Sequence, residues 1–296
     1  IADPTLDFSL ISGLETLTIS GSFVPVTITL PNIYTNLNVL TIRSIDIPLI
    51  DISNYINLEQ ISFSNTDVET LLLPNSTTLT RITISSHNLQ GIQNFASLPN
   101  LERLSITNNE NTPLLVNVTQ NLALSDINLS SNDMSVLDLT QNVLLEDINI
   151  SNNEFTTIDL TQNVLLEDLN VSSNNLPTLN VTQNVLLEYL YAGNNLLPNL
   201  DVTNNVELRQ IIISNNLFTT TGLDLTQNVE LNYIDISNNQ VESLYILDNV
   251  KLVSFVAHHN LFSGTDILDQ LFIVKSGYFG VSASNIIDVS FNNLSG

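Results

Sequence analysis

Apolar residues recur along this chain in a pattern that restarts every 21 to 23 residues. Within each unit the order is apolar, two free positions, apolar, one free, apolar, two free, asparagine. Leu145, Ile148, Ile150 and Asn153 fill these slots, and the following unit fills them again 21 residues later. The alternation around Ile148 predicts a short strand with one buried face, and the fixed period predicts a solenoid of stacked coils.

Twelve units open on a leucine, which we take as position one. They begin at Leu14, Leu37, Leu58, Leu79, Leu101, Leu124, Leu145, Leu166, Leu187, Leu208, Leu231 and Leu252. A thirteenth, degenerate unit begins near Ser284 and places Ile287, Val289 and Asn292 in the expected slots. Since no linker interrupts the series, we predict about thirteen coils in one domain.

We predict that this single domain covers residues 1–296. An N-terminal cap over residues 1–13 is followed by regular repeats over residues 14–263 and a longer last repeat over residues 264–296. The long last repeat contains an apolar stripe at helical spacing, which predicts one short helix. The stripe consists of Ile267, Leu268, Leu271 and Phe272.

Two columns of asparagine repeat with the same period. Position nine is Asn109, Asn132, Asn153, Asn174, Asn195, Asn216, Asn239 and Asn260, and the returning limb carries Asn121, Asn142, Asn163, Asn184, Asn205, Asn228 and Asn249. We expect buried amides in both columns to bond backbone groups of neighbouring coils, because buried polar groups need partners. Phrases such as IDLTQN alternate like a second short strand, so the outer side should be extended or turn-like, with few helices.

Charge narrows the classes of partner. Thirty acidic residues against six basic ones give a formal net charge of −24. Such a chain repels phosphate backbones and anionic lipid, which excludes nucleic acid and leaves cations, basic proteins and neutral glycans. No apolar run is long enough to cross a membrane, so membrane insertion is not expected, and IADPTLDF does not read as a signal peptide. The absence of cysteine excludes disulfides and thiolate metal sites.

The unit LxxLxLxxNxL resembles the leucine-rich repeat, and the 21-residue form with LDLTQN is similar to bacterial surface repeats of the internalin-like kind, especially those of Bacteroidetes. The chain differs in having serine where that group often has cysteine, at Ser130, Ser151, Ser172 and Ser214. The resemblance implies a right-handed curved solenoid with a concave parallel β-sheet. It also implies a non-enzymatic role in adhesion or host contact, at the bacterial cell surface or outside the cell.

Positions three and five of each unit should point outward from the sheet, because strand side chains alternate. The candidate binding residues on this face are Asp126, Asn128, Asp147, Asn149, Asp168, Asn170, Tyr189, Tyr191, Gln210, Ile212, Tyr233 and Asp235. The face changes along the chain from hydroxyl and arginine to carboxylate and amide, and then to aromatic and apolar side chains.

The carboxylates at position three allow two interpretations. Asp126, Asp147 and Asp168 should stack on adjacent strands, and like charges opposite one another destabilise a sheet. A sheet that keeps them in register could hold a hard cation such as Ca²⁺, for which carboxylate and amide oxygens are suitable ligands, or a basic partner. Copying of the LLED phrase between repeats explains the same column without any ligand.

The aromatic end of the face is the other candidate. Tyr189, Tyr191 and Tyr233 should gather beside Gln210, as in a protein-binding hot spot or a platform on which sugar rings stack. We therefore predict an extracellular recognition module that binds a protein partner. The alternative is a surface protein that binds glycans with the same tyrosines and carboxylates.

Catalysis and histidine metal binding are not expected from the sequence. No GxSxG motif is present, and carboxylates on an open sheet cannot exclude water. His258 and His259 are neighbours, so on a continuous strand their side chains would point to opposite sides and could not chelate together.

Overall fold

The computed structural model describes residues 5–7, 13–21, 27–29, 36–109, 113–263, 267–271 and 286–292. The chain divides into two compact units, Ile1–Leu144 and Leu145–Gly296. Each unit is a β-solenoid whose coils contribute one strand each to a parallel sheet. The prediction of a single domain stays a prediction.

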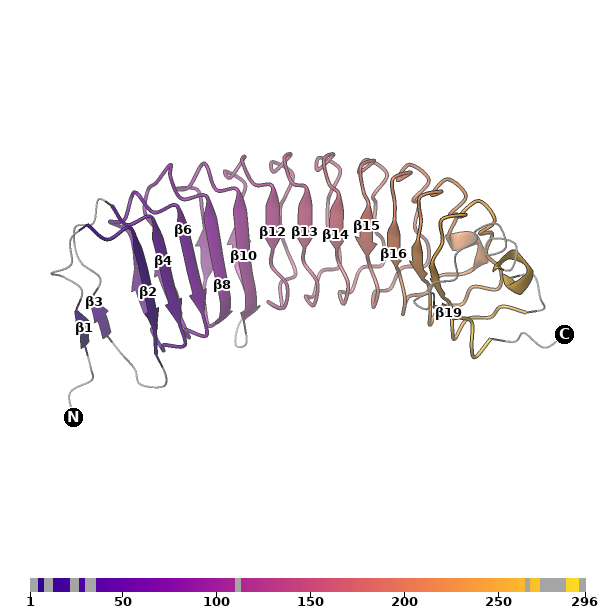
Figure 1. Ribbon diagram of the computed structural model, residues 1–296, viewed down its shortest axis with the longest axis horizontal. Coiled ribbons are helices and arrows are strands. Elements are labelled where there is room, and N and C mark those ends of the chain that lie inside the picture. The colour runs from indigo at the N-terminus through magenta and orange to yellow at the C-terminus, as the bar shows by residue number, and fades with distance from the viewer. Residues whose placement is uncertain are drawn as a thin grey trace. The chain divides into compact units, whose positions relative to one another are not determined.

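Six strands form the main sheet of the first unit, in chain order (Figure 1). They are β2 (Thr16–Ser20), β4 (Val39–Arg43), β6 (Gln60–Ser64), β8 (Arg81–His87), β10 (Arg103–Asn109) and β12 (Asp126–Asn128). Position three pairs with position three throughout, as in Thr16 with Val39 and Arg81 with Arg103. The register predicted from the repeat is therefore confirmed in this unit.

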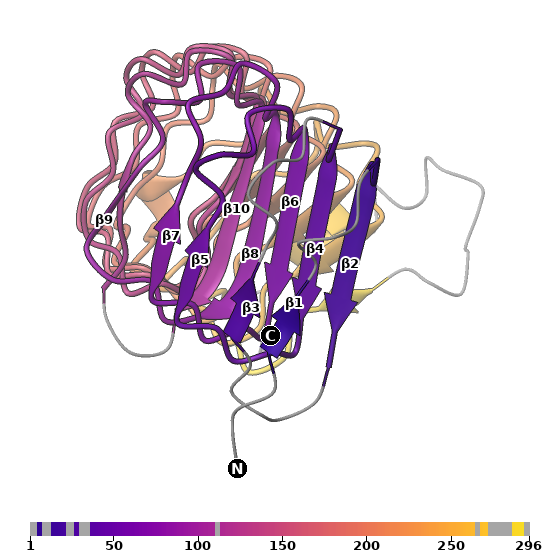
Figure 2. The same cartoon turned by 90° about the vertical axis from the view of Figure 1, so that its left-hand side faces the viewer.

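The returning limbs of the first unit carry three small parallel sheets of two strands each. They pair β1 (Thr5–Asp7) with β3 (Thr27–Thr29), β5 (Leu49–Asp51) with β7 (Thr70–Leu72), and β9 (Ile92–Asn94) with β11 (Leu115–Asn117). Figure 2 shows β5, β7 and β9 on the side opposite β4, β6 and β8. Each coil thus encloses the core between an inner strand and an extended return.

The second unit repeats the arrangement with seven shorter strands. They are β13 (Asp147–Asn149), β14 (Asp168–Asn170), β15 (Tyr189–Tyr191), β16 (Gln210–Ile212), β17 (Tyr233–Asp235), β18 (Ser254–Val256) and β19 (Ile287–Asp288). The degenerate last unit is confirmed, since Phe255 pairs with Ile287. Helix is scarce in the described residues, consisting of the 3-10 turn η1 (Thr220–Gly222) and residues 267–271.

A left-handed residue at position eight bends the chain at or near the end of the strand in every coil but the first. Twelve of these residues have φ between 51° and 60°. They are Ser44, Asn65, Ser86, Asn108, Ser131, Asn152, Ser173, Asn194, Asn215, Asn238, His259 and Phe291. Asparagine tolerates this conformation because its short amide bonds locally, which explains its frequency here, whereas a bulky residue such as Phe291 is strained.

The core is a stack of aliphatic side chains at positions one, four and six. Leu145, Ile148 and Ile150 are almost fully buried, as are their counterparts in neighbouring coils. Phe155 and Phe218 fill the interior at position eleven and are completely buried. Burial of such side chains contributes about 1.5–3 kcal/mol each, so the coils are held together chiefly by stacking.

The position-nine asparagines bond the backbone as predicted. Asn174 donates its Nδ2 to Ile150 O and Val171 O, both at 3.0 Å, and its Oδ1 accepts from Phe155 N at 3.0 Å. Ile150 and Phe155 belong to the preceding coil, so one side chain joins two coils. Asn195, Asn216 and Asn239 repeat the same connections.

The second asparagine column is also buried and structural. Asn184 is fully buried and donates to Leu160 O at 3.1 Å and Asn163 O at 2.8 Å. The return limbs of the first unit form the short strands β5, β7, β9 and β11, whereas residues 158–163 form no strand, so the prediction of an extended or turn-like outer side with few helices is confirmed. The carboxylate of Asp159 instead accepts hydrogen bonds from Thr161 N and Thr161 Oγ1, which closes a local turn.

The predictions for the N-terminal cap and for the helix in the last repeat fall partly on described residues. Of the predicted cap over residues 1–13, the backbone of β1 and residue Gly13 is described, and the rest lies outside the described residues. The helix predicted after residue 264 is confirmed over residues 267–271, where Ile267 and Leu271 are buried. Phe272 lies outside the described part of the chain.

Candidate recognition surface

The second unit brings ten of the twelve predicted binding residues onto one face. Asp147, Asp168, Tyr189, Gln210 and Tyr233 are consecutive partners across five strands. A parallel row at position five consists of Asn149, Asn170, Tyr191, Ile212 and Asp235. The residues between the two rows are buried, so both rows point away from the core, as predicted. We call these ten residues the outward face of the second unit.

Three half-buried tyrosines dominate one end of this face. Tyr189 and Tyr233 flank Gln210, and the hydroxyl of Tyr191 donates to Gln210 Oε1 at 3.4 Å. Burial and nearby acidic groups raise the pKa of Tyr191 and Tyr233, so both phenols stay protonated and can donate hydrogen bonds. Rigid aromatic side chains with a polar tip are typical of binding hot spots.

Arg209 borders the tyrosines from position two of its coil. Its guanidinium lies 2.9 Å from Glu188, as Arg209 Nη1 to Glu188 Oε2. A hydrogen bond with Tyr189, followed by the charge of Glu188, raises the pKa of Arg209. The arrangement orients Tyr189 beside Arg209.

The carboxylates form a tight group at the other end of the face. Asp147 pairs with Asp168 across β13 and β14. Burial is the largest cause that raises the pKa of Asp168, followed by the charges of Asp147, Glu188 and Glu167. The electrostatic potential at this end is therefore negative, so it would attract cationic groups of a partner.

Replacing Asp147 with asparagine is expected to lower the pKa of Asp168 towards its ordinary value without restoring it fully, since burial remains. Carbon-13 NMR titration of the Asp168 carboxyl measures the change. Asp159→Asn is the control, because Asp159 lies on the return limb and should leave the pKa of Asp168 unchanged. An Asp168 pKa that is the same in Asp147→Asn and in the unmodified protein would contradict the proposed coupling.

The amide and carboxylate side chains at position five also accept hydrogen bonds from the backbone, a role that was not predicted from the sequence. Asn149 Oδ1 accepts from Ser151 N at 3.1 Å and from Ser151 Oγ at 2.8 Å. Asp235 accepts from Ser237 N and Ser237 Oγ in the same way. These side chains terminate their strands by bonding the backbone two residues on, so only part of their bonding capacity is available to a ligand.

The remaining two predicted residues, Asp126 and Asn128, lie in the first unit. Asp126 pairs with Arg103, whose Nη1 lies 3.8 Å from Asp126 Oδ2, and both side chains are exposed. An exposed pair at this distance contributes little, about 0–1 kcal/mol. Arg103 thus offsets the charge of an acidic neighbour. Asn128 Oδ1 accepts from Ser130 N at 3.1 Å.

A metal site in the acidic column finds no geometric support. Among the described residues, no group of three or more His, Asp or Glu side chains is arranged to hold an ion.

The described part of the chain contains no helix that is long and apolar enough to span a membrane.

The prediction that His258 and His259 point apart is wrong. Their Nδ1 atoms are 2.8 Å apart. Strand β18 ends at Val256, and His259 has φ 55°, so the alternation of a strand no longer applies. The left-handed turn brings the two rings to the same side.

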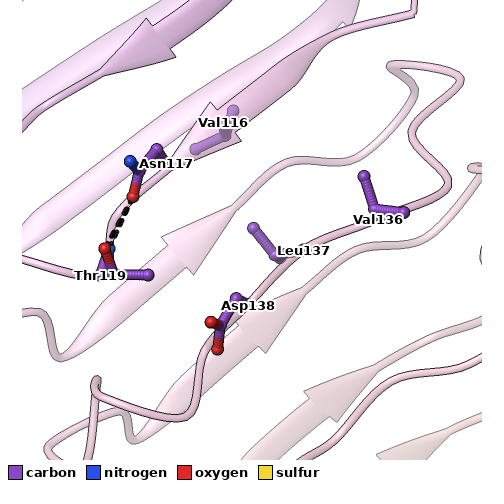
Figure 3. Close-up of a pocket in the computed structure, with 6 residues that line it drawn as sticks. All are labelled: Val116, Asn117, Thr119, Val136, Leu137 and Asp138. Carbon is purple, nitrogen blue, oxygen red and sulfur yellow. Dashed lines mark hydrogen bonds between the residues drawn. The ribbon is translucent and has the colours of Figure 1, made fainter.

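A shallow hollow of about 430 Å³ lies on the return limbs of the first unit (Figure 3). Val116, Asn117, Thr119, Val136, Leu137 and Asp138 line it. Asn117 Oδ1 accepts from Thr119 N and Thr119 Oγ1, so its polar atom closes a turn. The carboxylate of Asp138 likewise accepts from Thr140. The hollow contains none of the predicted binding residues, and its polar groups serve the backbone.

Comparison with known proteins indicates the fold. No protein-family model matches the sequence, and no curated protein is significantly similar to it. Among solved structures, an internalin (inlF) from Listeria monocytogenes matches with a TM-score of 0.75 and 18% identity, over 96% of this chain and 82% of that one. The functional domain of InlJ from the same organism, which includes a cysteine ladder, gives 0.67 and 21%, over 88% and 60%.

A plant protein has the same type of fold. The leucine-rich-repeat ectodomain of the membrane receptor kinase GASSHO1/SCHENGEN3 from Arabidopsis thaliana, in complex with CASPARIAN STRIP INTEGRITY FACTOR 2, gives a TM-score of 0.57 and 17% identity, over 88% of this chain and 38% of that one. This chain spans less than two thirds of the InlJ domain and of the plant ectodomain. The chain therefore has the leucine-rich-repeat fold, and its resemblance to internalin-like proteins is confirmed at the level of that fold.

Proposed function

We propose that this chain is a non-enzymatic recognition module, at the bacterial surface or outside the cell, that binds a protein partner. The observation that supports the proposal is the convergence of Tyr189, Tyr191 and Tyr233 on the outward face of the second unit, beside paired carboxylates. The fold adds support, because one structurally similar chain is a leucine-rich-repeat ectodomain in complex with CASPARIAN STRIP INTEGRITY FACTOR 2.

The physical basis for partner binding is that one sheet offers aromatic, hydrogen-bonding, apolar and charged contacts side by side. Tyr191 and Tyr233 each present an aromatic face and a protonated hydroxyl, and Ile212 adds an apolar contact between Tyr191 and Asp235. Aromatic residues on strands lose little conformational entropy on binding, so a few of them contribute most of the affinity of an interface. Asp147 and Asp168 add a negative border that selects partners with basic groups.

Alanine at all three tyrosines is expected to weaken partner binding at least about tenfold, or about 1.4 kcal/mol. The probes are peptides selected from a randomised displayed library against the unmodified protein. Fluorescence anisotropy then measures their affinity for Tyr189→Ala/Tyr191→Ala/Tyr233→Ala. Tyr245→Ala is the matched control, because Tyr245 is an exposed tyrosine on the return limb.

Equal affinity of the selected peptides for the triple variant and the unmodified protein would refute binding through these tyrosines. A glycan array tests the alternative ligand class with the same variants. Reproducible sugar binding that disappears in the triple variant, with no peptide selected on this face, would replace the protein partner with a glycan.

A further inference from the structure

The histidines at positions seven and eight of the β18 coil break the repeat. Position seven is serine in most coils, as in Ser214 and Ser237, and position eight is asparagine in the two preceding coils, at Asn215 and Asn238. His258 and His259 occupy these positions. Copying of the repeat therefore does not explain the pair, in contrast to the acidic column.

Local geometry holds the two rings together. The Nδ1 atoms are 2.8 Å apart, and the rings meet edge to face with centroids 5.0 Å apart. On its other side, His259 stacks on Phe291 with centroids 4.4 Å apart and planes 14° apart. Phe291 is itself in the left-handed conformation, which is strained for a bulky side chain. Strained residues concentrate at functional sites.

Two imidazole nitrogens at this distance have the spacing of metal ligands. Nitrogens bound to one ion at about 2.0–2.1 Å are about 2.9 Å apart at octahedral angles and about 3.3 Å at tetrahedral angles. Turning both rings so that their Nδ1 lone pairs converge on one point would convert the observed 2.8 Å contact into a chelating pair. The proton shared between the Nδ1 atoms would move to the Nε2 atom of its own ring, so neither imidazole changes its net charge.

The surroundings favour a cation. Asp288 lies on β19, the strand paired with β18, and accepts a hydrogen bond from Ser290 N at 3.0 Å. Asp288 pairs with Val256, two residues before His258, so a carboxylate lies on the strand next to that of the histidine pair. Among the described residues no third ligand completes the set, so water or a bound partner would fill the remaining positions.

We propose that His258 and His259 form a surface site for a divalent transition ion of the kind that imidazole prefers, such as Zn²⁺, Ni²⁺ or Cu²⁺. The site lies on the coil that follows the tyrosines, and it does not depend on the proposed function.

Zinc is the probe for this site, added to the whole chain in excess calcium, which occupies the many carboxylates. NMR of histidine-labelled protein is well suited, because the chain has three histidines and the buried His87 serves as an internal reference. Saturable shifts of His258 and His259, with His87 unchanged, are expected. His258→Ser and His259→Asn restore residues that other coils carry at these positions, so both variants should fold, and each should weaken zinc binding at least about tenfold.

The Asp147→Asn/Asp168→Asn variant is the matched control and should bind zinc as the unmodified protein does. The proposal would be overturned if neither histidine signal moves with zinc, or if His259→Asn binds zinc with unchanged affinity. Loss of binding in the aspartate variant alone would place the ion in the acidic column and would equally overturn the histidine site. Peptide binding by the histidine variants reports separately on the proposed function.

Discussion

Replacing Asn174 with alanine is expected to lower the free energy of unfolding by about 4 kcal/mol, a large fraction of the stability of an ordinary domain. The Asn174 amide donates to Ile150 O and Val171 O, and it accepts from Phe155 N. Alanine leaves the buried Phe155 N–H without this partner, whereas Ile150 O and Val171 O still accept from Asn153 Nδ2 and Asn195 Nδ2. The orphaned N–H costs about 1–3 kcal/mol and each of the two lost bonds to a carbonyl about 0.5–1.5 kcal/mol, and the cavity adds to that cost.

Chemical denaturation measured by circular dichroism tests the prediction, with Asn175→Ala as the matched control. Asn175 is adjacent and exposed, and its bond to Phe155 O uses only its backbone N–H, which alanine retains. The control should therefore change stability by no more than about 0.5 kcal/mol. If the two variants unfold at the same denaturant concentration, the amide does not join the coils as described.

Asn174→Asp separates the role of the donor from that of the acceptor. The aspartate keeps an oxygen for Phe155 N but places a second oxygen against the carbonyls of Ile150 and Val171. We expect this variant to be less stable than the alanine variant at neutral pH and to recover partly in acid, where a protonated carboxyl donates again.

The architecture follows from the repeat because period and geometry are directly linked. Once residues 21 apart are neighbours on adjacent strands, the core positions, the outward rows and the bonds of Asn174 follow without further information. The acidic pair Asp147 and Asp168 and the tyrosine cluster were located in this way. Their ligand was not, because an exposed surface restricts the chemistry of a partner without specifying its shape.

The prediction for the two histidines was wrong because the backbone leaves the strand there. Alternation predicts opposite directions for His258 and His259, but the left-handed turn at position eight reverses one of them. The frequent asparagine at this position was a usable signal, since asparagine is enriched in that conformation. Near Asp159 the outer side takes the turn-like form, one of the two forms predicted, because the Asp159 side chain bonds Thr161 and closes a turn.

His87 makes the first unit sensitive to acid. It occupies position nine, where later coils have asparagine, and only 1% of it is exposed. Its Nδ1 accepts from Leu89 N at 3.2 Å, while its Nε2 is buried without a hydrogen-bond partner. Burial lowers the pKa of His87 from 6.5 to about 4. The folded protein therefore keeps this ring neutral in a range of pH where the unfolded chain takes up a proton.

The sign of the effect follows from proton uptake. Between pH 6.5 and about 4 the unfolded state binds more protons at this site, so the stability that neutral His87 provides is complete above pH 6.5 and is lost as the pH falls towards 4. The loss amounts to about 3 kcal/mol at the lower limit. Many carboxylates titrate over part of the same range, so only a difference between matched proteins isolates this contribution.

His87→Asn provides that difference, because asparagine is the residue that later coils carry at position nine. The free energy of unfolding of the unmodified protein, minus that of the variant, should fall by about 3 kcal/mol between neutral pH and pH 4. Denaturant titrations of both proteins across this range measure it. Parallel stability curves for the unmodified protein and His87→Asn would mean that His87 takes up a proton equally in the folded and unfolded states, and the acid sensitivity assigned to its burial would be wrong.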